Sequence, residues 1–262
     1  MSEKATACIN CEAKMDSNYC PTCGQRAKVL PITWRGLFVG LTSRWLGMDN
    51  KLMRTVWGLM VRPTQVINAY LDGNRVRYIG PLSYLIVMSA IFILTFEVAG
   101  VSPREFLEAT SEKLQPQSVT GNAEVSENQK AFMENYMQSI SENMRLMTGA
   151  LIPFFALSML IFYRGRNFLQ NFLVVTYATS ELIWLSIISI IVFATLQIPI
   201  QVYLTIPSLL YMLWIFTGSN PQKNKIWTWL KAFFTWVVGY SLFMVAIFIA
   251  GITYFILFVF ER

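Results

Sequence analysis

Histidine is missing from all 262 residues of this chain. Its absence excludes histidine-ligated haem, histidine-containing metal centres and nucleophiles that a histidine activates. Glycine loops of the P-loop type, which bind phosphate groups, are missing as well. Because no catalytic residues can be named, the sequence favours a protein that is not an enzyme.

Charged residues are scarce, at 14% of the chain against about 25% in an average soluble protein. The stretch from Asn167 to Gln222 contains a single charge, Glu181. One helical crossing of a membrane takes roughly 20 residues, so this stretch is long enough for two crossings. Pro199 and Pro207 favour a tight turn between them. We therefore expect a multi-pass membrane protein.

Apolar runs elsewhere extend this pattern to an all-α transmembrane domain over residues 79–262, with about five transmembrane helices. A polar helical loop, residues 98–145, separates the first two spans. The fourth span has an alternative as a re-entrant hairpin because of its prolines. The first 30 residues lack an apolar segment, so we expect the first span, and no cleavable signal peptide, to direct insertion. The predicted spans are 79–97, 146–163, 172–196, 200–217 and 233–260.

Residues 31–78 are predicted to lie beside the membrane, because charges interrupt each apolar run. Amphipathic helices are expected at 34–45, 49–60 and 64–71. They can lie in the cytoplasmic headgroup layer or pack on the ends of the spans, and both alternatives stay open. The apolar stripe of the second helix consists of Leu52, Met53, Val56, Trp57 and Met60.

A cationic group follows these helices, and it is a candidate contact for anionic lipid or an acidic partner. The alternative is ordinary anchoring by basic residues on the inner side of a membrane. The residues are Arg62, Arg75, Arg77 and Tyr78.

All four cysteines lie near the N-terminus, as two CxxC pairs separated by eight residues. Each pair places two thiolates on one tight turn, and two such turns can form a tetrahedral four-sulfur site. We expect a structural zinc ion in a small zinc ribbon, residues 1–30, which folds by binding metal. Two disulfides and a rubredoxin-like iron site are the alternatives. The predicted ligands are Cys8, Cys11, Cys20 and Cys23.

The segment Tyr19-Cys20-Pro21-Thr22-Cys23-Gly24-Gln25 resembles the signature of a bacterial membrane family, domain-of-unknown-function family 3667. Later motifs of that family have counterparts in Arg62-Pro63, in Tyr70-Leu71-Asp72-Gly73-Asn74-Arg75 and in Arg77-Tyr78-Ile79-Gly80-Pro81. The resemblance covers roughly the first third of the chain. It implies a zinc ribbon on a membrane domain and implies no known activity.

The distribution of Lys and Arg predicts the orientation. The net charge is +6, and the whole excess lies in residues 1–78, which suits the cytoplasmic side of a bacterial inner membrane. The loop 98–145 is acidic and suits the exterior. We therefore expect a cytoplasmic N-terminus, in the compartment that keeps cysteines reduced, and an extracytoplasmic C-terminus.

Glu181 is the one carboxylate predicted inside the membrane, about ten residues into the third span, where a charge costs about 2.5–3.5 kcal/mol. It can carry a proton, hold a cation or bind a basic substrate group. The alternative is a structural carboxylate, neutral or paired with Arg164 or Arg166.

The sequence thus favours a non-enzymatic membrane protein whose cytoplasmic zinc ribbon and basic amphipathic helices dock a protein partner or anionic lipid. The alternative is a transporter or channel component that uses Glu181. Five spans are few for a secondary transporter unless the protein forms a homo-oligomer. The basic flank is explained by the membrane, so we expect no nucleic acid partner.

Overall fold

A computed structural model describes residues 7–15, 17–28, 31–34, 49–114, 138, 144–163, 165–219 and 224–260. These residues form eight α-helices and no β-strand, apart from two isolated bridges near the cysteines. The predicted all-helical class is therefore confirmed for the described residues. The helices are α2 (Asp49–Val61), α3 (Pro63–Leu71), α4 (Pro81–Ala99), α5 (Pro103–Leu114), α7 (Met144–Phe162), α8 (Phe168–Leu196), α9 (Gln201–Ser219) and α10 (Lys225–Phe260).

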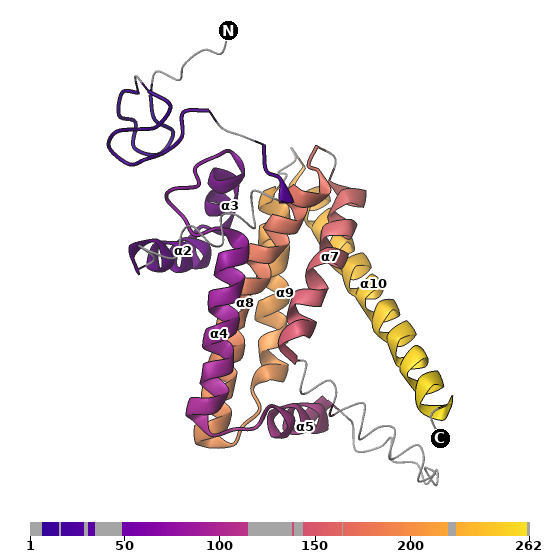
Figure 1. Cartoon of the computed structure of the whole chain (residues 1–262). Coiled ribbons are helices and arrows are strands. Elements are labelled where there is room, and N and C mark those ends of the chain that lie inside the picture. The colour runs from indigo at the N-terminus through magenta and orange to yellow at the C-terminus, as the bar shows by residue number, and fades with distance from the viewer. Residues whose placement is uncertain are drawn as a thin grey trace.

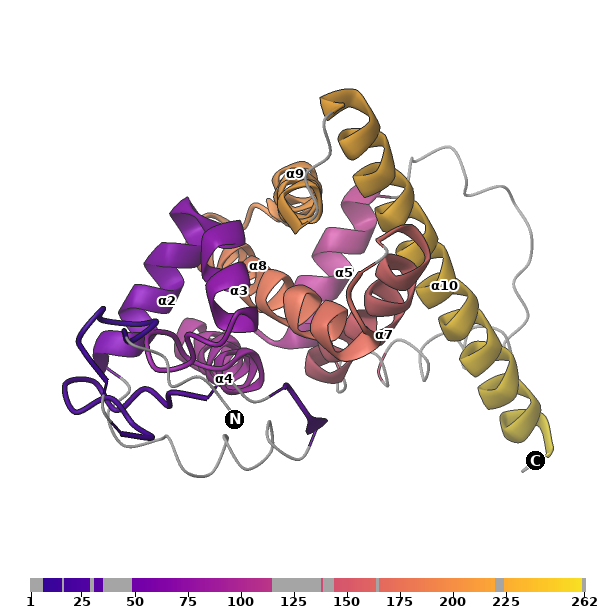
Figure 2. The ribbon, with the colours of Figure 1, turned by 90° about the horizontal axis from the view of Figure 1, so that it is seen from above.

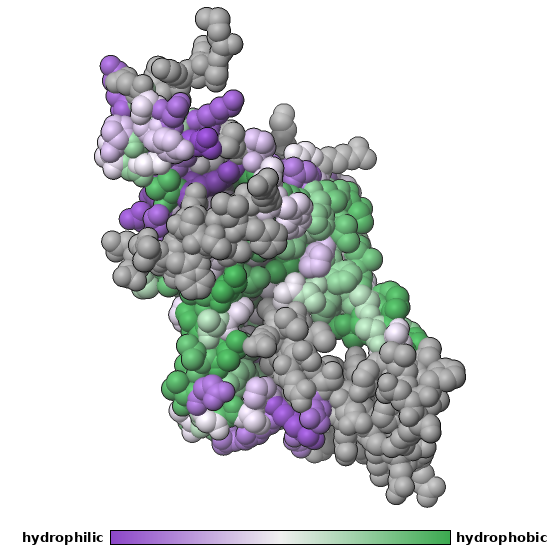
Figure 3. All heavy atoms as spheres, in the orientation of Figure 1, coloured by the Kyte–Doolittle hydropathy of each residue, from purple (hydrophilic) through white to green (hydrophobic). Residues whose placement is uncertain are grey.

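Four of the described helices, α4, α8, α9 and α10, are long and apolar enough to cross a membrane. In α7 the apolar part with described side chains, Gly149–Phe162, is shorter. Figure 3 shows an apolar surface along the helices, with hydrophilic residues gathered toward its two ends. Such a band is the surface that lipid tails cover.

Helix α8 is the centre of the bundle and contacts α4, α7 and α9. Every residue from Leu173 to Glu181 is buried. This explains why the sequence of α8 is apolar on all sides rather than amphipathic. Helices α4 and α8 run side by side in the same direction, since Tyr84 meets Glu181 near the start of α4 and Phe96 packs with Phe193 near the end.

Local sequence signals set the ends of α8. At its start Asn167 and Gln170 exchange hydrogen bonds in a capping box. At its end Gln197 is left-handed and the chain turns before α9 begins at Gln201. The predicted turn between the two prolines is wrong, because Pro199 lies in this turn but Pro207 lies inside α9. Helix α9 is continuous through Pro207.

Helices α2 and α3 and the loop 72–80 form one unit at an end of the bundle, which we call the collar. Helix α2 lies across the end of α4. Helix α4 is seen lengthwise in Figure 1 and nearly end-on in Figure 2. Helix α3 is packed against the bundle through Val66, Ile67 and Tyr70.

The apolar stripe predicted for α2 is divided between two environments. Leu52 and Val56 pack against the core, and Leu59, which the stripe did not include, is fully buried. Met53 and Trp57 are instead exposed, at 69% and 70%. Helix α3 therefore follows the alternative of packing on the spans, whereas α2 leaves an apolar face uncovered.

Several predicted features lie outside the described residues. One is the amphipathic helix at 34–45, of which only Trp34 is described. Another is Arg164. The third is the loop 98–145 beyond Leu114, of which only residues 138, 144 and 145 are described. The first part of that loop forms α5, at the end of the bundle opposite the collar (Figure 1). Ser102 caps α5, since its Oγ accepts a hydrogen bond of 3.1 Å from the amide of Glu105.

Candidate metal centre and membrane carboxylate

The four cysteines lie on two short turns that have the same backbone hydrogen bonding. In the first, the amide of Cys8 donates to the carbonyl of Ala13 at 2.9 Å. In the second, the amide of Cys20 donates to the carbonyl of Gln25 at 2.8 Å. The turns are therefore two copies of one motif, which we call the first and second knuckles.

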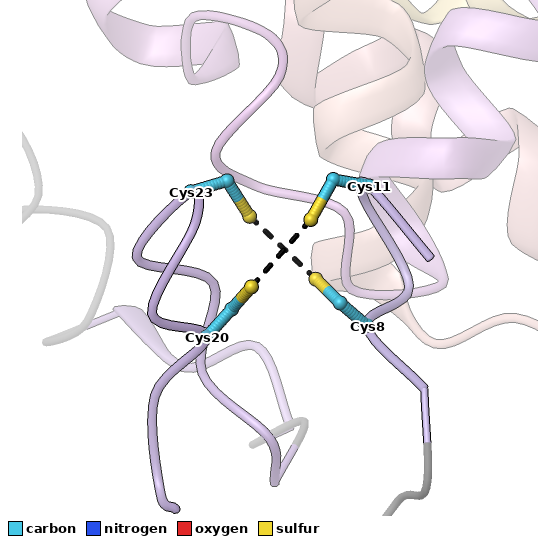
Figure 4. A group of neighbouring side chains, drawn as sticks. All are labelled: Cys8, Cys11, Cys20 and Cys23. Carbon is cyan, nitrogen blue, oxygen red and sulfur yellow. Dashed lines mark hydrogen bonds between the residues drawn. The ribbon is translucent and has the colours of Figure 1, made fainter. Parts of the chain in front are cut away.

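The knuckles direct their four sulfur atoms toward one point (Figure 4). All four Sγ atoms lie within 4.8 Å of one another, with Cys8–Cys23 and Cys11–Cys20 at 3.5 Å. Four thiolates each about 2.3 Å from a zinc ion would be separated by about 3.8 Å, so the set fits a tetrahedral metal site. All four thiols are free, and the alternative of two disulfides does not hold.

Backbone amides in the second knuckle favour the thiolate form of Cys20. Burial acts to raise the pKa of this thiol, but hydrogen bonds from the backbone of Cys23 and Thr22 oppose it, and the pKa is lowered to about 6. The thiolate, not the thiol, is the form that binds a metal ion. These hydrogen bonds favour the ionised form of Cys20 within the cluster, whereas the pKa of Cys11 is raised.

The second knuckle also contacts the collar. The side chain of Gln25 is only 4% exposed, and its Nε2 donates to the carbonyl of Gly73 at 2.9 Å. Gly73 lies in the collar loop with a φ of 109°, a conformation that favours glycine. This hydrogen bond holds the cysteine cluster against the collar.

Hydrogen bonds to backbone groups fasten the collar itself to the membrane helices. The hydroxyl of Tyr177 in α8 donates to the carbonyl of Ile79, and the amide of Ile79 donates to Thr55 Oγ1 at 3.0 Å. The hydroxyl of Tyr211 in α9 donates to the carbonyl of Leu59 at 3.1 Å. The collar is thus bonded to two different membrane helices.

Glu181 is 5% exposed and accepts a hydrogen bond of 2.5 Å from the hydroxyl of Tyr84. Arg166, one of its two predicted partners, instead donates to Asn68 Oδ1 in α3 at 2.9 Å. Fifteen residues separate Arg166 from Glu181, roughly 22 Å along a helix, which is too far for an ion pair. The second predicted partner, Arg164, lies outside the described residues.

Glu181 lies close to the collar and not at the middle of the bundle. It follows the start of α8 at Phe168 by thirteen residues, but its partner Tyr84 lies in the first turn of α4. The first turns of α8 therefore extend beyond α4 and are enclosed by the collar. Oε1 of Glu181 is buried without a hydrogen-bond partner among the described residues, so this oxygen can accept a proton or bind a cation.

The four residues predicted to contact lipid or a partner all belong to the collar. Arg62 is exposed between α2 and α3. Arg77 is also exposed, and its guanidinium carbon lies 5.7 Å from the ring centre of Tyr78. Arg75 is half-buried. Two exposed guanidinium groups thus lie at the same end of the molecule as the cysteine cluster.

Sequence reasoning missed the residues that connect these sites. Tyr177 precedes Glu181 by four residues and so shares a face of α8, which was the one signal available for it. Tyr84 and Tyr211 carried no signal, because their partners are distant in the sequence. Gln25 is the last residue of the motif that begins at Tyr19, but the motif alone assigned it no role.

Comparisons with known proteins give one match. No curated protein and no solved structure matches this chain. Residues 49–93, which include α2, α3 and most of α4, match the model of a family described as "Protein of unknown function (DUF3667)". This stretch of the chain is therefore similar to the family that the sequence motifs resemble, domain-of-unknown-function family 3667.

Proposed function

We propose that this chain is a non-enzymatic integral membrane protein whose zinc-bound ribbon and basic collar dock anionic lipid and a protein partner at the cytoplasmic face. The observation that carries the proposal is the uncovered face of α2. Met53 and Trp57 on this face are exposed and apolar, and Arg54 beside them is exposed and basic. Helices with this composition bind in the headgroup layer.

The geometry of the collar supports contact with lipid. Helix α2 lies across the end of α4 (Figure 1), so it is parallel to the membrane surface when α4 crosses the membrane. Trp57 and Met53 can then enter the boundary between headgroups and acyl chains, while Arg62 and Arg77 reach phosphate groups. The cysteine cluster, held by Gln25 on the same end, is left to face a protein partner.

The ribbon fits a structural role. Four thiolates complete a tetrahedral shell around zinc and leave no position for water or substrate, so the bound ion would fix the two knuckles in place. A reduced cysteine cluster also suits the cytoplasm of a bacterial cell, and the protein would lie in the inner membrane.

Native mass spectrometry of the purified protein can test the lipid contact. The double variant Arg62→Gln/Arg77→Gln should retain less phosphatidylglycerol than the wild type, because both phosphate contacts are removed. Arg104→Gln is the matched control, since Arg104 is also exposed but lies at the opposite end, paired with Glu108. Equal retention by the double variant and the wild type would contradict the lipid contact.

The partner contact needs a separate test. A photo-crosslinking residue at exposed Tyr19, in the second knuckle, should capture a protein in cells, and the same residue at Glu108 on α5 should not capture it. The same adduct from both positions, or none from Tyr19, would contradict docking through the ribbon.

A transporter or channel component remains the second candidate, and one observation favours it. Glu181 is buried with one carboxylate oxygen, Oε1, that has no partner among the described residues. Buried carboxylates of this kind occur in pathways for protons and cations.

A further inference from the structure

We propose that the side chain of Gln25 is a clasp that couples metal binding by the cysteine cluster to the conformation of the collar loop. The coupling works in both directions: metal loading orders residues 73–78, and an ordered loop tightens metal binding. It does not depend on what the collar or the ribbon docks.

Gln25 belongs to the metal site through its backbone. Its carbonyl accepts the amide of Cys20 at 2.8 Å, and Gln25 follows Cys23 by two residues in the same knuckle. The position of Gln25 is therefore fixed by the same two cysteines that would hold the ion. When the metal is absent, a ribbon of this size loses its structure, and Gln25 loses its position with it.

The carbonyl that accepts the Gln25 hydrogen bond lies at a turn of the collar loop. The carbonyl of Gly73 receives two donors, Nε2 of Gln25 at 2.9 Å and the amide of Arg75 at 2.9 Å. Gly73 is left-handed, and the amide of Asn74 returns to the carbonyl of Ala69, so the loop reverses direction here. This turn determines where the chain that carries Arg75 and then Arg77 leaves α3.

The two knuckles carry different residues at the position of Gln25. Ala13 occupies in the first knuckle the position that Gln25 occupies in the second, and its carbonyl makes the same hydrogen bond to a cysteine amide. A knuckle therefore forms without a side-chain amide at this position. The Gln25 side chain is buried, and among the described residues its one hydrogen bond to a distant part of the chain is the bond to Gly73. Its role is to join the two parts.

Thermodynamic linkage gives the size of the effect. If the hydrogen bond forms only in the metal-bound ribbon, its contribution adds to metal affinity, and metal binding stabilises the loop by the same amount. One neutral hydrogen bond corresponds to a change of about five-fold in an equilibrium constant.

Zinc affinity of the full-length protein in detergent, measured by competition with a chelator, tests the clasp. Gln25→Ala should bind zinc about five-fold more weakly, and Gln25→Glu more weakly still, because a carboxylate would face the Gly73 carbonyl. Gln65→Ala is the control, since Gln65 is an exposed glutamine of α3. Wild-type affinity in both Gln25 variants would overturn the proposal.

A measurement on the collar separates coupling from damage to the ribbon. In the wild type, removal of zinc should accelerate hydrogen exchange of the amides at 73–78, and in Gln25→Ala these amides should exchange fast with zinc present. Gly73→Ala, which strains the left-handed turn 48 residues away, should also weaken zinc binding. Exchange at 73–78 that is unaffected by zinc, or normal zinc binding by Gly73→Ala, would overturn the coupling.

Discussion

Glu12 and Gly24 occupy equivalent positions in the two knuckles, each four residues after a cysteine whose carbonyl accepts its amide. Both are left-handed, with φ of 60° and 72°. Glycine adopts this conformation freely, whereas a residue with a Cβ atom adopts it at a cost of about 1 kcal/mol. The first knuckle is thus strained where the second is not.

Exchanging these residue types should change metal affinity in opposite directions. Glu12→Gly should tighten zinc binding about two- to five-fold by removing the strain, and Gly24→Ala should weaken it by a similar factor. An added Cβ at Gly24 would meet no atom within 4 Å, so backbone strain alone is tested. Chelator competition measures both, and a loss of affinity in Glu12→Gly would contradict the account.

The identity of the metal is a prediction of its own. Elemental analysis of the purified protein should give about one zinc ion per chain, and Cys20→Ser should release it, since the lost thiolate is a ligand with a lowered pKa. Stoichiometric iron would instead support the rubredoxin-like alternative.

Glu181 can be tested by two substitutions with different consequences. Glu181→Gln keeps the shape and a hydrogen-bond acceptor for Tyr84, so the protein should fold and insert normally, whereas a function that needs a proton or a cation should be lost. Glu181→Leu leaves the buried Tyr84 hydroxyl without its acceptor and should cost about 1–3 kcal/mol of stability. Thermal unfolding in detergent measures the stability, and full cellular function of the Gln variant would remove the support for transport.

The sequence predicted the cysteine cluster because metal-ligand spacing is a local property. It did not predict the partners of Gln25 or Glu181, which lie 48 and 97 residues away, because such pairings arise only when the helices pack. The alternative of a Glu181–Arg166 pair failed for a related reason, because Arg166 lies before the start of α8, where Asn68 of α3 accepts its hydrogen bond.

At the scale of elements, the lengths of the apolar runs predicted where the membrane helices lie. The sequence did not predict which faces of the helices are buried. The hydrophobic runs of α8 and α10 are visible in the sequence because a membrane demands them. The two sides of α2 are both apolar, so periodicity could not show that Leu59 faces the core and Trp57 does not. A proline inside α9 also carried a false turn signal, since Pro207 is tolerated within the helix.

The contact between α7 and α10 depends on a glycine, Gly239, which has no side chain to clash with α7. A Cβ added at Gly239 in α10 would lie 2.7 Å from the ring of Phe155 in α7, which is 4% exposed. Gly239→Ala should therefore destabilise the protein by about 1–3 kcal/mol. Gly149→Ala, where a Cβ meets nothing within 4 Å, is the control and should not lower the melting temperature.

At the scale of the whole molecule, the collar and α5 lie at opposite ends of the helices (Figure 1). With a cytoplasmic collar, a thiol reagent that cannot cross membranes should label Glu112→Cys on α5 in intact cells and should not label Gln65→Cys on α3. Both positions are exposed, so access to the reagent is matched. Wild-type cells give the background from the native cysteines, and the reverse pattern would invert the proposed orientation.

The parallel arrangement of α4 and α8 has a consequence for biosynthesis. Tyr84 and Glu181 are 97 residues apart, and a ribosome adds about 5–20 residues per second, so roughly 5–20 s pass between the synthesis of the two. During that interval the acceptor for the Tyr84 hydroxyl of α4 does not yet exist. Even α7 is made before α8, which carries this acceptor. A hydroxyl in hydrocarbon without an acceptor is costly. The nascent α4 therefore needs a temporary partner for Tyr84, water at the headgroups or the insertion machinery, until α8 arrives.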